Sequence, residues 1–166
     1  MNATAENIKQ RLSLRQPLKE ALDNLVQLSE TIELQKEVDL AATLSEVKKL
    51  FPTCTDFERE FPSICFSIAT GVGKTRLMGA CIAYLYLEKG IRNFFVLAPN
   101  LTIYNKLIED FGNSTNPKYV FTGIGEFVHN KPVIITGDNY TQVSSLFSDS
   151  EIRINIFNVS KFNSEN

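Results

Sequence analysis

The stretch that decides the fold is Ala69-Thr70-Gly71-Val72-Gly73-Lys74-Thr75, which follows an apolar run and precedes a segment with helical spacing. Gly71 and Gly73 lack a Cβ, so the backbone can turn successive N–H groups toward one point. A helix that begins at Lys74 adds the positive end of its dipole. Such a loop is suited to hold phosphate oxygens.

Two side chains of this stretch carry the chemistry of the expected site. Lys74 can reach the β- and γ-phosphates of a nucleoside triphosphate, and we take it as the catalytic residue. The Thr75 hydroxyl can ligate Mg²⁺. The alternative interpretation is a glycine-rich turn in which the Lys-Thr pair occurs by chance. The expected nucleotide-binding residues are Thr70, Gly71, Val72, Gly73, Lys74, Thr75 and Arg76.

Beyond this loop, apolar runs alternate with segments of helical spacing. Strands are expected at Ile64–Ala69, Asn93–Ala98, Tyr119–Phe121, Val133–Thr136 and Ile152–Val159, and helices at Lys74–Glu88 and Leu101–Phe111. Fully apolar strands that alternate with helices predict an α/β fold with a parallel sheet covered on both faces. We expect the first two strands in the sheet interior.

The part before the loop has the spacing of amphipathic helices. Apolar residues recur three or four apart over 18–28 and 38–50, and Pro17 suits a first helical turn. Loop-like residues at Phe51–Pro62 end this part. We place Glu109 and Asp110 on a solvated helix face, and the single histidine, His129, in a surface loop.

The phosphate-loop stretch resembles motif I of superfamily-two helicases and translocases, most of all that of the restriction subunits of type I and type III restriction enzymes. The full phosphate-loop pattern has an early glycine where this chain has Ile68, as in the shortened motif. Val96–Thr102 is similar to motif Ia, and 154–162 to motif Ib. The resemblance implies a RecA-like, phosphate-loop NTPase fold preceded by N-terminal helices. Its expected parts are an N-terminal helical segment, 1–62, and a partial ATPase core, 63–166.

The resemblance also implies a function, which is ATP binding with Mg²⁺ in a DNA-dependent ATPase of a restriction system. A modification methyltransferase is the implied protein partner. Leu18 stands where the family has an adenine-reading Gln, which leaves Arg15 and Gln16 as adenine candidates; the alternative is a plain amphipathic helix. Each of the two segments that would contact DNA has an alternative interpretation. The segment similar to motif Ia could be an ordinary strand-to-helix loop, and the segment similar to motif Ib could be a plain edge strand. The implied DNA-backbone contacts are Pro99, Asn100, Leu101, Thr102, Asn158, Ser160 and Lys161.

Composition narrows the possible partners. The 166 residues hold 17 Lys and Arg against 19 Asp and Glu, a net charge of −2. This balance excludes a charge-driven nucleic-acid binder, so DNA contacts must depend on local geometry. No apolar run approaches the roughly 20 residues of a spanning helix, and we expect a cytoplasmic protein without a membrane segment. Cys54, Cys65 and Cys81 are expected to be single, buried or half-buried thiols.

Two other functional classes stay open. One is a stand-alone phosphate-loop kinase for small molecules, and the other is a nucleotide-dependent interaction module built on the N-terminal helices. No Asp-Glu pair occurs in the chain, although a superfamily-two motor uses one to hold Mg²⁺ and to orient water. A second motor domain with its arginine finger is also lacking. We therefore expect the front part of a longer protein.

These missing parts predict that residues 1–166 bind ATP weakly and hydrolyse it negligibly. An arginine finger alone contributes about 10³–10⁵-fold in related phosphoryl transfers. Steady-state phosphate release should read near background with or without DNA. Turnover above about 1 s⁻¹ would mean that the chain supplies its own catalytic carboxylate.

Overall fold

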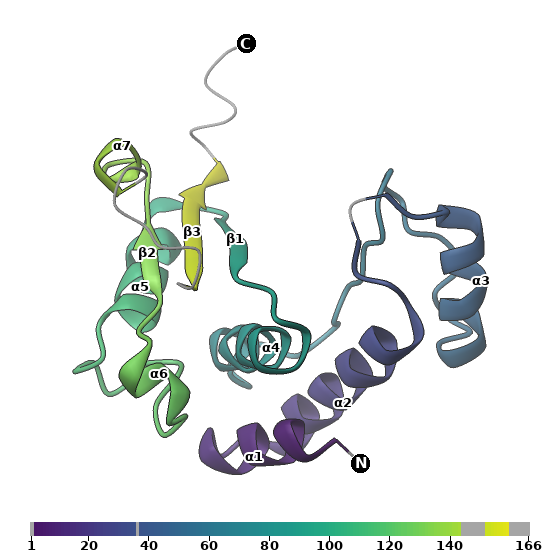
Figure 1. Cartoon of the computed structure of the whole chain (residues 1–166), viewed down its shortest axis with the longest axis horizontal. Coiled ribbons are helices and arrows are strands. Elements are labelled where there is room, and N and C mark those ends of the chain that lie inside the picture. The colour runs from purple at the N-terminus through teal and green to yellow at the C-terminus, as the bar shows by residue number, and fades with distance from the viewer. Residues whose placement is uncertain (1, 36, 144–151, 160–166) are drawn as a thin grey trace.

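The computed structural model describes residues 2–35, 37–143 and 152–159. Figure 1 shows helix α4 between a small sheet and the N-terminal helices, with α3 farther out beside α2. The helices are α1 Ala3–Arg11, α2 Gln16–Thr31, α3 Leu40–Leu50, α4 Lys74–Lys89, α5 Leu101–Gly112, α6 Glu126–His129 and α7 Tyr140–Val143. The strands are β1 Asn93–Ala98, β2 Val133–Ile135 and β3 Arg153–Asn158. The α/β class expected from the sequence is confirmed.

The sheet is parallel and has the order β1-β3-β2. One face is buried through Val96, Ala98, Ile154 and Ile156. Helix α5 covers this face and contacts all three strands; a Cβ at its last residue, Gly112, would lie 3.0 Å from Ile134 Cγ1 of β2. On the other face Phe95 and Leu97 are 59 % and 51 % exposed. Because these side chains are exposed, the expectation that helices cover both faces of the sheet is wrong. Among the described residues β1 is also an edge strand, so the expectation that it lies in the sheet interior is wrong too.

Two of the expected strands are absent. Residues 64–69 are extended but carry no strand pairing, and Ile64 is 40 % exposed. An apolar run becomes a strand only where a neighbouring strand supplies hydrogen-bond partners, and no described strand lies alongside it. Tyr119–Phe121 lies in turns, where its apolar side chains are buried by other means. The Phe121 ring stacks on that of Phe127, with the centroids 4.3 Å apart.

The other strands and helices expected after the phosphate-loop stretch lie close to their predicted bounds. β1 and α5 begin where expected, and α5 ends one residue later, at Gly112. Helix α4 ends at Gly90, whose left-handed backbone (φ 65°) suits glycine. β2 and β3 fall within the two remaining apolar runs.

Helix α1 was not expected, because its sequence is polar and has few apolar positions. Asn2 caps it by accepting a hydrogen bond from the Ala5 N–H, at 3.0 Å. Ala5 and Ile8 are buried, and Lys9 forms ion pairs with Glu6 and with Asp23 of α2. Packing and ion pairs, rather than a long apolar pattern, hold this helix.

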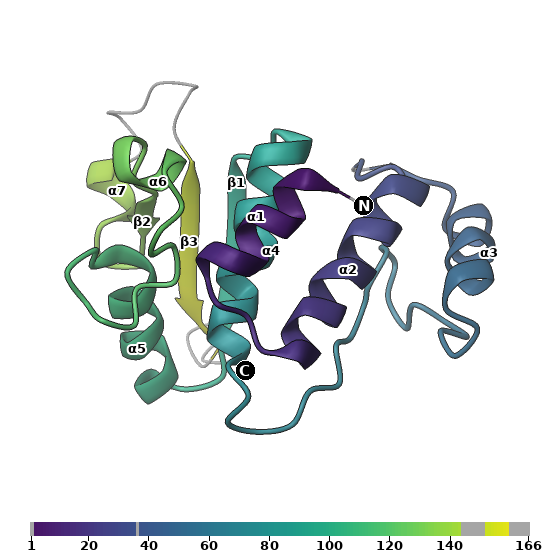
Figure 2. The same cartoon turned by 90° about the horizontal axis from the view of Figure 1, so that it is seen from below.

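The N-terminal helices share the main core with the phosphate-loop region. Both α1 and α2 pack against α4, and Figure 2 shows α1 lying along it. Leu18 and Leu22 of α2 join the same apolar cluster as Tyr84 of α4. The buried hydroxyls of Ser29 and Tyr84 lie 3.1 Å apart, so Tyr84 is a core residue.

The far end of α2 belongs to a second, smaller cluster. Its buried members are Leu28 and Ile32, Val47 of α3, and Phe57 of the following loop. In the described residues, no helix is long and apolar enough to cross a membrane.

The contact between α4 and the aromatic turn predicts a sensitive position at Gly79. A Cβ there would lie 2.7 Å from Val120 Cβ and 3.1 Å from the Val120 carbonyl oxygen. Gly79→Ala should lower the free energy of unfolding by about 1–3 kcal/mol, because the turn must move. Urea denaturation measures the change.

Gly125→Ala is the matched control, since a Cβ at Gly125 meets nothing within 4 Å and the backbone φ is −59°. Its effect should stay within about 0.5 kcal/mol. Equal losses in the two variants would contradict the packing argument.

Candidate functional site

The glycines of the phosphate-loop stretch have the backbone that the motif requires. Gly71 and Gly73 have φ values of 76° and 115°, in the range that favours glycine. Helix α4 begins at Lys74, directly after this turn, and no side chain caps it. Its first N–H groups are therefore available to an anion, which is the donor set that phosphate oxygens need. The residues present fit a phosphate group.

Leu18 of α2 packs against the phosphate-loop stretch at Gly73. It is 1 % exposed, and its Cδ1 atom would lie 3.3 Å from a Cβ at position 73. The residue that replaces the family's Gln thus packs under the loop.

Helix α5 brings a second cation to the loop. Lys74 is exposed, whereas Lys106 Nζ donates to Thr75 Oγ1 at 3.3 Å and to Asp110 Oδ2 at 2.6 Å. Asp110 is 3 % exposed and also accepts from Asn116 Nδ2 at 3.3 Å. The expectation of a solvated Asp110 is wrong, because these donors allow its burial; Glu109 is exposed. Apart from its spacing of four from Asp110, no signal in the sequence marked Lys106 as a residue of the site.

Arg76 contacts the segment that follows α1. Its Nη1 atom donates to the carbonyl oxygen of Leu12 at 2.9 Å, just after α1. This bond ties α4 to the C-terminal end of α1, where the carbonyls lack helical partners.

The two adenine candidates lie at the start of α2. Arg15 Nη1 approaches the Gly71 carbonyl oxygen at 3.4 Å, and Gln16 Nε2 donates to Glu20 Oε1 at 2.9 Å. A pocket of about 340 Å³ lies between α2 and the extended segment before the loop. Neither candidate lines it. Its lining includes Pro17, Glu20, Asn24, Ala69 and Val72.

The candidate DNA contacts meet at the carboxyl ends of β1 and β3. The sheet register pairs Ala98 with Asn158, so the loop that begins at Pro99 starts beside Asn158. Asn100 caps α5 by accepting from the Ile103 N–H at 2.9 Å, while Pro99, Leu101 and Thr102 are exposed. Asn158 is only 6 % exposed. Ser160 and Lys161 lie outside the described residues.

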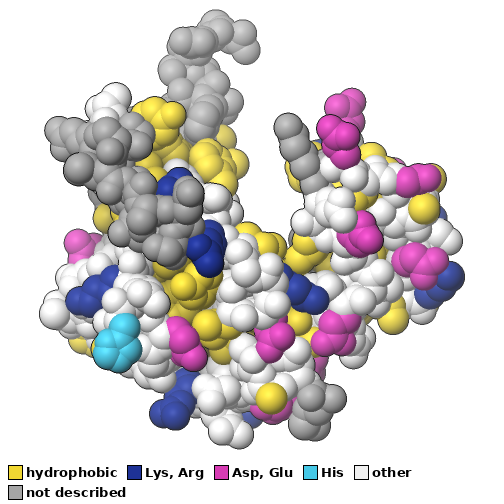
Figure 3. Space-filling view, viewed as in Figure 1, with side chains coloured by type: hydrophobic (Ala, Val, Ile, Leu, Met, Phe, Trp, Pro, Cys, Tyr) yellow, Lys and Arg dark blue, Asp and Glu magenta, His cyan; other side chains and the backbone are white. Residues whose placement is uncertain are grey.

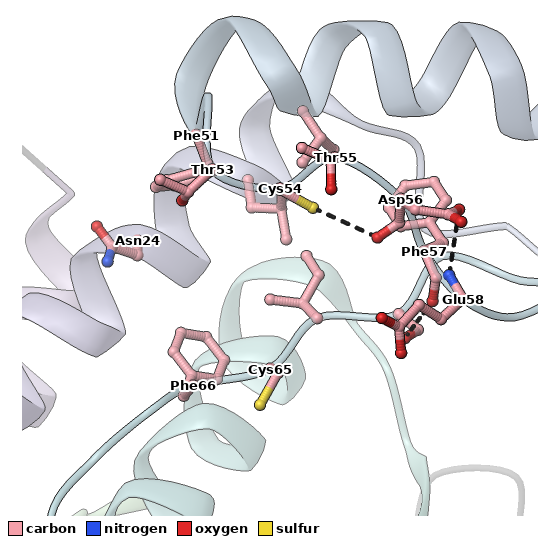
Figure 4. Close-up of a pocket in the computed structure, with 14 residues that line it drawn as sticks. Asn24, Phe51, Thr53, Cys54, Thr55, Asp56, Phe57, Glu58, Cys65 and Phe66 are labelled. Atoms are coloured by element: carbon pink, nitrogen blue, oxygen red, sulfur yellow. Dashed lines mark hydrogen bonds between the residues drawn. The ribbon is translucent and has the colours of Figure 1, made fainter.

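A separate pocket of about 450 Å³ lies between α2, α3 and the loop 51–66 (Figure 4). It is lined by none of the expected site residues. Within the loop, Ser63 Oγ donates to the Phe57 carbonyl oxygen at 2.9 Å. Figure 4 shows Asn24 on one wall and Cys54 and Cys65 on others.

The three cysteines are free thiols, as expected. Cys65 is exposed, contrary to expectation, because the segment that contains it is not a strand. Burial raises the pKa of the Cys81 thiol to about 12, which leaves it protonated at neutral pH. No group of three or more metal-binding His, Cys, Asp or Glu side chains occurs within the described ranges. His129 ends α6 and is exposed.

Charge on the face seen in Figure 3 is uneven. Acidic side chains gather over the N-terminal helices, and basic ones are scattered rather than massed beside the sheet. A hydrophobic area lies near the sheet. This face lacks the basic stripe of a protein held to DNA mainly by charge.

The chain belongs to the family described as "Type III restriction enzyme, res subunit", which it matches over residues 11–166. The family corresponds to the N-terminal region of superfamily-two helicases and is ATPase-like. The resemblance seen in the sequence is confirmed.

A curated relative supports the same assignment. It is the "Probable type III restriction-modification enzyme HindVIP Res subunit" of Haemophilus influenzae, 38 % identical over 71 residues. The match covers 39 % of this chain and 14 % of that protein, so the chain spans a small part of the relative's length. No solved structure gives a significant match.

The Arg76 contact predicts an effect on the stability of the chain. Arg76→Met removes the bond to the Leu12 carbonyl but keeps the apolar stem, and should lower the free energy of unfolding by about 1 kcal/mol. Thermal or urea denaturation without nucleotide measures it. Unchanged stability together with weaker nucleotide binding would instead place the guanidinium on the ligand.

Proposed function

We propose that the chain binds ATP with Mg²⁺ at Thr70–Thr75 and that the intact protein uses ATP hydrolysis to translocate DNA in a restriction system. The observation that carries this is the uncapped start of α4 behind two left-handed glycines, with Lys74 and Thr75 in its first turn. ATP, when bound, supplies the phosphoryl group that is transferred to water.

The chain's own residues have distinct roles in this proposal. The amides of Gly71–Thr75 bind phosphate oxygens, and Lys74 stabilises the negative charge that builds up on the transferred group. The Thr75 hydroxyl is the proposed Mg²⁺ ligand. Val72 contributes its backbone and lines the neighbouring pocket.

The pocket beside the loop is our proposed place for the base. Its walls come from α2 and from the segment that leads into the loop, and it is next to the phosphate-binding amides. Arg15 reaches the loop from the start of α2 through the Gly71 carbonyl. Arg15 and Gln16 stay the proposed adenine contacts, since Pro17, which follows them in the chain, lines this pocket.

DNA would cross the exposed loop Pro99–Thr102 at the start of α5. Backbone amides at a helix start can bind a phosphate without a basic cluster. The burial of Asn158 supports a role in holding that loop. Ser160 and Lys161 stay proposed contacts on the strength of the motif Ib resemblance.

Three further points belong to the proposal. The division into residues 1–62 and 63–166 describes sequence character, since α1 and α2 share the core of the second part. A modification methyltransferase subunit is the proposed partner of the intact protein, in line with the printed name of the relative. A cytoplasmic location follows from a DNA substrate of this kind.

Lys74→Ala tests nucleotide binding. The variant should lose at least about tenfold in affinity for a fluorescent ATP analogue with Mg²⁺, since one charged contact to phosphate contributes roughly 1.5–3 kcal/mol. Fluorescence titration measures it in the chain as it stands.

Lys89→Ala is the control, because Lys89 is also exposed but lies at the opposite end of α4. It should bind like the unaltered chain. Equal affinity of the two variants would refute the site.

A further inference from the structure

The contact between Lys106 and Thr75 places a positive charge where the proposed metal should bind. A hydroxyl oxygen that ligates Mg²⁺ lies about 2.1 Å from the ion. The Lys106 ammonium lies 3.3 Å from that same oxygen. The two cations repel each other and compete for the same lone pair.

The surroundings of Lys106 allow its ammonium to move away from Thr75 while it stays close to the Asp110 carboxylate. Its side chain is 43 % exposed, so it has room to move toward solvent. Asp110 stays close by, one helical turn along α5, and is held by Asn116 Nδ2. The buried carboxylate therefore keeps the ammonium near the loop in either position.

We propose that Lys106 is a positioning residue, which lies at the cation position beside Thr75 and exchanges with Mg²⁺ when nucleotide binds. This inference rests on the proposed ATP site and assigns to it a residue outside the phosphate-loop motif.

One face of α5 connects Lys106 with the candidate DNA loop Pro99–Thr102. Thr102, Lys106 and Asp110 are spaced by four and share one face of α5. The helix is anchored by its buried residues Tyr104, Leu107 and Phe111. Thr102, in the first turn of α5, is therefore the residue of the candidate DNA loop that lies one helical turn from Lys106.

The test is the Mg²⁺ requirement for nucleotide binding. Affinity for a fluorescent ATP analogue is measured with Mg²⁺ and with EDTA, and the ratio of the two affinities is compared among variants. Lys106→Met should raise the ratio by about threefold to tenfold, because the metal no longer competes with a fixed charge. Lys106→Arg keeps the charge and should restore the ratio of the unaltered chain.

Two variants guard this result. Lys106→Met leaves Asp110 buried without its cation, so the double variant Lys106→Met/Asp110→Asn repeats the measurement with neither charge present. Lys89→Met removes a positive charge at the far end of α4 and should leave the ratio unchanged.

The outcomes separate the two proposals. An unchanged ratio in both Lys106→Met variants overturns the exchange, whether affinity falls equally in both buffers or stays the same. No binding by the unaltered chain in either buffer overturns the ATP site and the exchange together. Binding that depends on Lys74, with a raised ratio in the Lys106→Met variants, supports both.

A second readout follows the helix. Nucleotide with Mg²⁺ should shift the Thr102 amide resonance of the unaltered chain, and the shift should fall by at least half in Lys106→Met. An equal shift in both proteins overturns the link to α5.

Discussion

The left-handed turn at Gly73, packed on Leu18, is the constraint on which this site depends. The turn ends the extended segment, starts α4 and sets Lys74 and Thr75 in the first helical turn. Leu18 fills the space beneath it, so any side chain at position 73 would meet both an unfavourable backbone angle and a buried neighbour. Because Leu18 belongs to α2, the loop needs the N-terminal helices for its shape.

The fold was predictable wherever local signals marked the ends of an element. β1 and α5 follow the sequence closely, because Pro99 and Asn100 mark a strand end and a helix start, and α4 ends at a glycine. The run at 64–69 has an equally apolar sequence, yet pairing depends on a neighbouring strand, which no local pattern specifies. Tyr119–Phe121 shows the same limit, since aromatic rings can be buried by stacking as well as by sheet formation.

The residues of the site were likewise predictable only where the signal was local in the sequence. The phosphate-loop motif predicts the positions of its glycines, Lys74 and Thr75, because their roles depend on residues next to one another in the chain. Contacts between distant segments had no such signal: Leu18 under Gly73, Arg76 on the Leu12 carbonyl and Lys106 on Thr75. Asp110 is the clearest case, since only the fold supplies the donor from residue 116 that helps to bury it.

Helix α2 contributes side chains to two separate apolar clusters. We therefore expect two parts of the chain to open at different free energies. Its first turns belong to the main core with α4, whereas its last turn and Val47 of α3 belong to the small cluster. The small cluster has four buried side chains, so the α3 unit should open at a lower free energy than the core. Amide hydrogens of α3 would then exchange with solvent while those of α4 remain protected, and the phosphate loop would keep its shape through such local openings.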